Sequence, residues 1–210
     1  HRRLKIMDLS DGSAQPMIDS QLGLSLAFNG AIYNFPELRA ELEALGYAFY
    51  SGGDTEVLLK GYHAWGEALL PKLNGMFAFA IWERDAKRLF IARDRLGVKP
   101  LYLSRTGERL RFASTLPALL KGGDISPMLD PVALNHYLNF HAVVPAPRTL
   151  VAGIEKLPPA TWLRIDAQGN TEQKTWWTLP YGPHADEAHF TLEDWRDRVL
   201  DSTREAVAIR

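Results

Sequence analysis

The sequence predicts an α+β fold in which antiparallel hairpins build two facing sheets, with helices on the outside. Three pairs of strand-like segments are each joined by a short polar turn, which favours antiparallel pairing over parallel β-α-β units. Capped helical segments lie between the pairs. The 210 residues are 46% hydrophobic and 23% charged, a composition that supports a globular core and excludes disordered, collagen-like and coiled-coil chains.

The first predicted elements are a strand, a tight turn and a helix. Large apolar and small residues alternate over residues 22–28, which is the period-two pattern of a strand with one apolar face. Asn29-Gly30 predicts a tight turn that ends this strand and lets Ile32-Tyr33 pair back. A helix is then expected from its N-cap Asn34 to the stop signal Gly46.

A second helix and three hairpins follow. Residues 47–50 predict a short strand, residues 51–53 a turn, and Asp54 the N-cap of a helix that Gly66 ends. The predicted hairpins pair residues 76–82 with 88–92, residues 101–103 with 110–113, and residues 162–165 with 172–177.

Two short helices and a loop are expected among the later hairpins. The helices span residues 116–121 and 131–139, and Asp130 is the N-cap of the second. Residues 141–159 carry four prolines and little periodicity, so they predict a loop over the surface.

The end of the chain differs from the rest in its pattern. We expect one domain over residues 1–180 and a linker over residues 181–190. Thr191 and Asp194 then form the capping box of a helix that continues to the last residue with an apolar stripe on one face. Such a stripe needs a surface to dock on.

Charge and residue usage exclude several classes of function. A net charge of -1 favours neither nucleic acid nor an anionic membrane as partner, and no apolar run has the length of a membrane span. The absence of cysteine excludes disulfides, thiolate metal sites and cysteine nucleophiles within these residues, and the scattered histidines predict no metal site. Residues 51–54 open like a pyrophosphate-binding loop, but Glu56 replaces its final serine and would repel phosphate, which favours an ordinary glycine turn.

Four residues are candidates for chemistry, each with a structural alternative. Asn29 and Gly30 offer a side-chain amide and a backbone N–H, which suit an oxyanion hole or a plain hairpin turn. Asp54 would hold a ligand ammonium or serve only as a helix N-cap. Arg3 would clamp a carboxylate or lie solvated at the surface. The charged residues 93–100 predict a salt-bridged turn.

A series of short sequence blocks occurs in a specific order. They are residues 1–8, 15–17, 28–34, 53–57, 74–80, 93–102, 112–114 and 153–159. Together they resemble the class II glutamine amidotransferase domain of asparagine synthetases, over about residues 1–180. The opening block and residues 175–177 most resemble the N-acetylglutaminylglutamine amidotransferase branch.

The resemblance implies a fold and a chemistry. The fold would be an N-terminal nucleophile hydrolase-like αββα sandwich, with two antiparallel sheets between helical layers. The reaction would be hydrolysis of glutamine to glutamate and ammonia by an N-terminal cysteine whose own α-amine serves as base. By the matching positions, Arg3 would bind the α-carboxylate of glutamine, Asp54 its α-ammonium, and Asn29 with the Gly30 N–H the oxyanion.

The same resemblance implies a larger cytoplasmic protein. Ammonia would pass to a synthetase domain of the same polypeptide that activates a carboxylate with ATP and magnesium, and residues 191–210 would be the first helix of that domain. No cofactor or metal is expected within the present residues. Glutamine is the expected small-molecule partner, nucleic acid and membranes are not expected, and a homodimer is left open.

The chain departs from the family pattern at the nucleophile. The catalytic cysteine and the Arg-His-Arg-Gly-Pro stretch after it would precede the first residue, so these 210 residues are expected to be truncated at both ends and inactive alone. Ala31 also stands where many relatives have glutamate. The alternative is a natural non-catalytic scaffold domain, as in β-lactam synthetases. Four retained candidates argue against it: Arg3, Asn29, Gly30 and Asp54.

Overall fold

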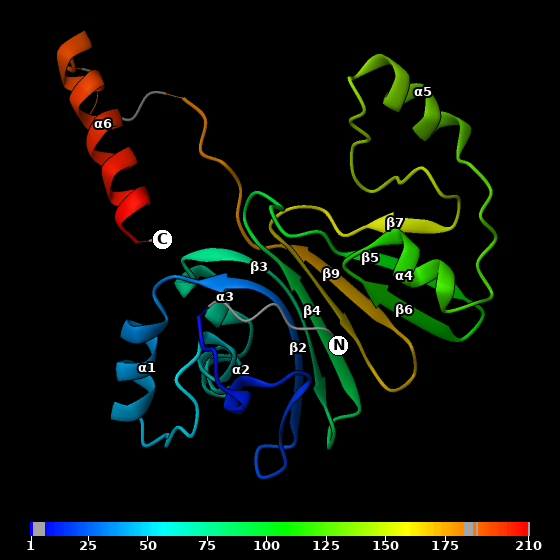
Figure 1. Ribbon diagram of the computed structural model, residues 1–210, viewed down its shortest axis with the longest axis horizontal. Coiled ribbons are helices and arrows are strands. Elements are labelled where there is room, and N and C mark those ends of the chain that lie inside the picture. The colour runs from blue at the N-terminus through cyan, green and yellow to red at the C-terminus, as the bar shows by residue number, and fades with distance from the viewer. Residues whose placement is uncertain (2–6, 183–186, 188, 210) are drawn as a thin grey trace. The chain divides into compact units, whose positions relative to one another are not determined.

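The computed structural model describes residues 1, 7–182, 187 and 189–209, which fall into two units, His1–Trp177 and Thr178–Arg210. In the described part of the first unit, two antiparallel sheets have the strand orders β1-β2-β3-β4-β8-β9 and β6-β5-β7 (Figure 1). The large sheet contains β1 (Met17–Asp19), β2 (Leu24–Ile32), β3 (Gly75–Glu83), β4 (Arg88–Arg93), β8 (Thr161–Ile165) and β9 (Thr171–Thr175). The small sheet contains β5 (Tyr102–Thr106), β6 (Arg109–Ala113) and β7 (Ile154–Lys156).

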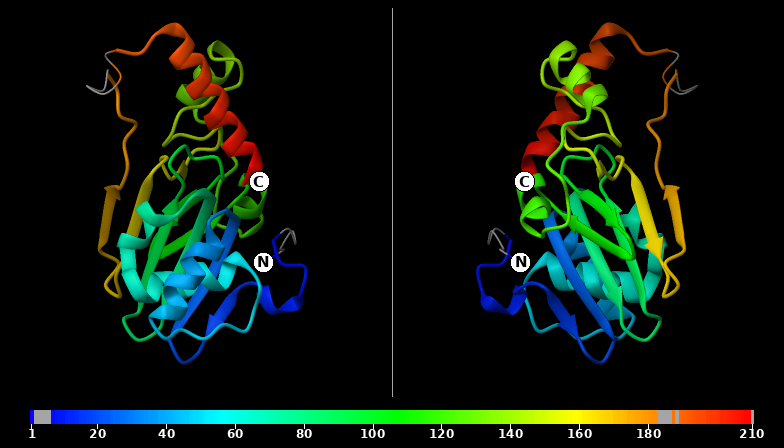
Figure 2. Two further views of the ribbon diagram at one scale, coloured as in Figure 1. Left: turned by 90° about the vertical axis from the view of Figure 1, so that its left-hand side faces the viewer. Right: turned by 90° about the vertical axis from the view of Figure 1, so that its right-hand side faces the viewer.

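Helices flank the pair of sheets. One face of the large sheet is covered by α1 (Phe35–Ala44), α2 (Asp54–Trp65) and α3 (Leu69–Lys72), and the small sheet lies against its other face (Figure 2). The short helix α4 (Leu116–Lys121) packs against β5 and β6. The predicted α+β fold of two antiparallel sheets with helices outside is therefore confirmed.

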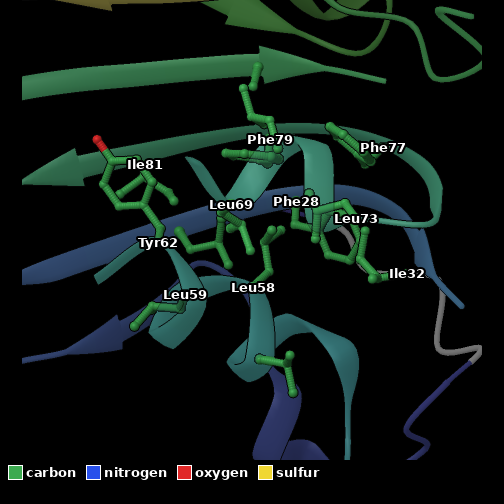
Figure 3. Packing of buried hydrophobic residues seen from close by; sticks show 14 of the residues in the cluster. Phe28, Ile32, Leu58, Leu59, Tyr62, Leu69, Leu73, Phe77, Phe79 and Ile81 are labelled. Carbon is green, nitrogen blue, oxygen red and sulfur yellow. The ribbon is translucent and has the colours of Figure 1, made fainter. Parts of the chain in front are cut away.

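Strand β3 is buried on both faces and holds the layers together. Phe77, Phe79 and Ile81 point to the helices, where they join the core shown in Figure 3. The alternate residues Ala78 and Ala80 point to the small sheet and contribute to a second apolar cluster. Burial of each large side chain contributes roughly 1.5–3 kcal/mol. The small alanines leave room for the second sheet, so one strand serves both cores.

The three predicted hairpins and both predicted short helices are confirmed. β3 pairs with β4, β5 with β6 and β8 with β9. Helix α5 (Pro131–Asn139) begins at the N-cap Asp130, whose carboxylate accepts hydrogen bonds from the N–H groups of Val132 and Ala133. These signals are local, which is why the sequence alone was sufficient for them.

The predicted turn at Asn29-Gly30 is wrong. β2 continues through both residues, which pair with Ala78 and Phe77 of β3 in an unbroken register. A Cβ on Gly30 would lie 2.2 Å from the carbonyl oxygen of Met76. The glycine is required by the close approach of two strands and not by a turn.

Two other local predictions are also wrong. Residues 47–50 form no strand, because side chains of α2 rather than a neighbouring strand bind their backbone. The predicted loop at residues 141–159 contains strand β7, which pairs with β5. Strand β7 is only three residues long, too short to show a period-two pattern.

The second unit contains helix α6 (Leu192–Ala208), which begins at the predicted capping box. The Thr191 hydroxyl accepts a hydrogen bond from the Asp194 N–H at 3.2 Å, and the Asp194 carboxylate accepts one from the Thr191 N–H at 2.7 Å. Across the described residues, no helix combines the length and the apolar character that crossing a membrane requires.

Candidate active site

The end of β2 and the start of α2 meet at a buried carboxylate. Asp54 is the first residue of α2 and is 4% exposed. Its Oδ2 accepts a hydrogen bond from the N–H of Ile32 at 3.0 Å. Ile32 is the last residue of β2 and lies two positions after Gly30. The structure therefore brings Asp54 to the strand segment that carries Asn29 and Gly30, although more than 20 positions separate them in the sequence.

The expected role of Asp54 as the helix N-cap is wrong. The N-cap of α2 is Gly53, and the Asp54 carboxylate binds a strand rather than its own helix. A carboxylate in the first turn also interacts favourably with the positive end of the helix dipole. The position is thus suited to an anionic side chain.

Asn29 and Gly30 lie on the central part of the large sheet. Phe28 belongs to the core under the helices, so its neighbour Asn29 lies on the opposite face, on the side of the small sheet. Asn29 is paired with Ala78, and Ala78 with Arg93 of β4, so the three residues form one row across the sheet. This arrangement puts the Asn29 amide on a rigid strand.

The loop before Asp54 is bound by a second buried carboxylate. Glu56 is fully buried and accepts hydrogen bonds from the N–H and the hydroxyl of Ser51 at 2.7 and 2.6 Å. Lys60, one turn further along α2, forms an ion pair with Glu56. The donors of Ser51 are therefore engaged within the protein, which agrees with an ordinary glycine turn rather than a pyrophosphate loop.

The segment that follows the opening residues packs on the same loop. Asp8 accepts hydrogen bonds from the Ser13 hydroxyl at 2.6 Å and from the Ser10 N–H at 2.8 Å. These bonds, together with the Gly52 N–H, hold the pKa of the Asp8 carboxyl well below its usual value. A Cβ on Gly53 would lie 2.5 Å from the Ser13 hydroxyl oxygen, so this glycine allows the two segments to touch.

Arg3 lies outside the described residues. Of the other candidates, Asn29 and Gly30 lie on β2, and Asp54 contacts that strand at Ile32. Among the described residues, no group of three or more histidine, aspartate or glutamate side chains has the arrangement of a metal site.

The charged segment after β4 is not the predicted salt-bridged turn. Arg93 donates to the carbonyl oxygens of Gly97, Lys99 and Leu157 at 2.6, 2.7 and 2.5 Å. Burial lowers the pKa of this guanidinium. The sequence did not predict this role, although a charged residue at the end of a buried strand was a signal for it. Arg93 fixes the backbone beside the row that contains Asn29.

Its neighbour Asp94 has the same kind of role. Asp94 is 2% exposed and accepts hydrogen bonds from four backbone N–H groups. These belong to Phe77, Leu96, Val98 and Lys99, at distances between 2.8 and 3.2 Å. The carboxylate replaces regular strand pairing where β4 ends, so the loop is ordered by a side chain.

The chemical capacity of the site follows from these groups. A carboxylate attracts a cationic ligand group, while a neutral amide and backbone N–H groups stabilise an oxygen that becomes negative. The sequence contains no cysteine, so these groups include no thiolate nucleophile.

Known proteins are similar to this chain in sequence and in fold. Asparagine synthetase [glutamine-hydrolyzing] 1 of Bacillus subtilis is 39% identical over 202 residues, which are 96% of this chain and 31% of that protein. Asparagine synthetase [glutamine-hydrolyzing] 3 of the same organism is 34% identical over 99% of this chain and 34% of that protein. The chain thus spans about a third of the length of these relatives.

A solved structure supports the fold alone. The glutamine phosphoribosylpyrophosphate amidotransferase of B. subtilis is 23% identical, with a TM-score of 0.50 over 74% of this chain and 30% of that chain. The expected N-terminal nucleophile hydrolase-like sandwich is thereby confirmed. The family described as the glutamine amidotransferase domain matches residues 1–177, and the chain belongs to that family.

Proposed function

We propose that this chain is the glutamine-hydrolysing part of a longer, ATP-dependent amide synthetase of the asparagine synthetase type. The observation that carries the proposal is the 3.0 Å hydrogen bond from the Ile32 N–H to the Asp54 carboxylate. It joins a buried anion to the strand end that carries Asn29 and Gly30. In this proposal the group for the ammonium end of glutamine comes from the start of α2, and the groups for its amide end come from the strand that α2 contacts at Ile32.

Each candidate has a role that fits its chemistry. Asp54 binds the α-ammonium of glutamine and Arg3 binds its α-carboxylate, because each side chain has the charge opposite to that of its partner. The Asn29 amide and the Gly30 N–H donate to the carbonyl oxygen, whose negative charge grows in the transition state. Neutral donors on a rigid strand stabilise this charge without reorganisation at the moment of reaction.

The nucleophile in this proposal is a cysteine at the N-terminus of the longer protein. Its thiolate adds to the amide carbon, ammonia leaves after it takes up a proton, and water then hydrolyses the thioester to glutamate and regenerates the thiol. The 210 residues contain no cysteine. We therefore expect them to bind glutamine without hydrolysing it.

The ammonia is used in a second part of the same polypeptide. That part would activate a carboxylate with ATP and magnesium and form an amide, and residues 191–210 would be its first helix. The opening block and residues 175–177 favour the N-acetylglutaminylglutamine amidotransferase branch. The protein would work in the cytoplasm.

The experiment that tests this function measures glutamate and ammonia release from glutamine by the gene product read from its own start. We expect release that stops when the N-terminal cysteine is changed to alanine. Asp54→Asn should raise the KM for glutamine by roughly tenfold to a hundredfold, because a charge-assisted hydrogen bond to the substrate is worth about 1.5–3 kcal/mol.

The matched control is Asp85→Asn, which removes the same charge from a side chain that is 79% exposed. Its KM should equal that of the wild type. A folded full-length protein that releases no ammonia would overturn the proposal and favour the non-catalytic scaffold. An Asp54→Asn variant with an unchanged KM would remove Asp54 from the glutamine site.

A further inference from the structure

The loop between α1 and α2 is held by a buried ion pair on α2. Glu56 and Lys60 are 0% and 5% exposed and lie one helical turn apart. The Lys60 ammonium also donates to the Ala48 carbonyl oxygen and lies 4.7 Å from the centre of the Phe49 ring. The pair therefore reaches back from the helix to the loop that precedes it.

The Glu56 carboxylate binds the loop directly. It accepts hydrogen bonds from the Tyr50 N–H at 3.1 Å, from the Ser51 N–H at 2.7 Å and from the Ser51 hydroxyl at 2.6 Å. Burial by itself would raise the pKa of Glu56, but the hydrogen bonds from Lys60 and Ser51 outweigh it, so the pKa lies below its usual value. The hydrogen bonds of this carboxylate to described residues go to the loop and to Lys60.

These contacts constrain the path to Asp54. Only Gly52 and Gly53 separate Ser51 from Asp54, and glycines by themselves leave a chain free. The Glu56 contacts hold the loop at Ser51, and the hydrogen bond to Ile32 holds it at Asp54. The loop that leads into Asp54 is therefore held at both ends, by Glu56 at Ser51 and by Ile32 at Asp54.

We propose that Glu56 is a positioning residue for glutamine, which holds residues 51–53 on α2 so that the Asp54 carboxylate meets the α-ammonium of the substrate. This inference rests on the proposed function of Asp54. A buried ion pair gains little net stability, because the loss of hydration offsets the attraction between the charges. The Glu56–Lys60 pair therefore contributes mainly by holding the loop, through its hydrogen bonds to Ala48, Tyr50 and Ser51.

The test compares glutamine with glutaramate, the analogue that lacks the α-amino group, in the full-length protein. The substitution is Glu56→Gln, whose amide cannot accept from all the donors of Tyr50, Ser51 and Lys60. In this variant the ratio of kcat/KM for glutamine to kcat/KM for glutaramate should fall roughly tenfold. The fall should come from a higher KM for glutamine, while kcat for glutamine stays within about twofold of the wild-type value. The milder variant Ser51→Ala removes one hydrogen bond to Glu56 and should lower the ratio in the same direction.

A double-mutant cycle separates positioning from general destabilisation. If Glu56 acts through Asp54, the effects of Glu56→Gln and Asp54→Asn on the ratio are not additive, because Asp54→Asn has already removed the preference that Glu56 supports. The control is Leu59→Val on the same helix, which trims a buried side chain that makes none of these loop contacts. Its ratio should match the wild type even though its stability falls.

The results test the positioning role of Glu56 separately from the proposed hydrolysis of glutamine. An active wild-type enzyme whose preference for glutamine survives both Glu56→Gln and Ser51→Ala overturns the positioning role and leaves the proposed function intact. Additive effects of Glu56→Gln and Asp54→Asn overturn it as well. A wild-type protein that does not hydrolyse glutamine overturns the function itself.

Discussion

Adding one methyl group at Gly30 should strongly destabilise the protein. The new Cβ would lie 2.2 Å from the Met76 carbonyl oxygen and 2.8 Å from the Phe77 Cα. Both are backbone atoms of β3, the strand buried between the two cores, and they cannot rotate away. Overpacking of a core costs about 1–3 kcal/mol, and we expect the upper end, about 3 kcal/mol, because two strands must separate.

Urea unfolding of the 210-residue chain measures this cost. With a slope of about 2 kcal/mol per molar urea, the midpoint for Gly30→Ala should fall by about 1.5 M. The control is Gly52→Ala, because a Cβ at Gly52 meets nothing within 4 Å and the residue does not have a left-handed conformation. Its midpoint should stay near that of the wild type. If the urea midpoint of Gly30→Ala is as high as that of Gly52→Ala, the close approach of β2 and β3 does not require a glycine at position 30.

Two further predictions concern charged groups near the site. Hydrogen bonds from Ser13 and Ser10 hold the pKa of Asp8 below its ordinary value of 3.8, so this carboxylate stabilises the fold above that pH and loses its contribution as pH falls through the folded pKa. Urea midpoints should show Asp8→Asn less stable than the wild type at about pH 6, and the gap should narrow by about pH 3; a gap that widens contradicts the assignment. Arg93→Lys keeps the charge but loses the fork that binds three carbonyl oxygens, at a cost of about 2–4 kcal/mol. Its Tm should fall by about 8 °C, whereas Arg204→Lys on the exposed face of α6 should leave the Tm unchanged.

Elements with local signals could be predicted from the sequence. The helix after Asp130 and the helix after Thr191 both begin where the caps predict, because an N-cap bonds N–H groups two or three residues ahead. The hairpin of β3 and β4 was predictable for a similar reason, since an apolar run, a charged turn and a second apolar run lie next to each other in the sequence.

The candidate site was predictable only in part. Asn29, Gly30 and Asp54 could be proposed from residue type and from the order of the sequence blocks, but Glu56, Arg93 and Asp94 could not be given their roles. A carboxylate that binds backbone N–H groups of a loop has the same sequence signature as a solvated one. The difference is burial, which depends on elements distant in the chain.

The sequence by itself determined the hairpins, the capped helices, the α+β class and the family, because these depend on neighbouring residues or on ordered blocks. The tertiary structure alone decided that Asn29-Gly30 lies within a strand and that Asp54 binds Ile32 rather than its own helix. A glycine permits either a turn or a close approach, and an aspartate either caps a helix or bonds a distant strand. Which of these occurs depends on the partner that folding brings next to the residue, here Met76 on β3 and Ile32 at the end of β2.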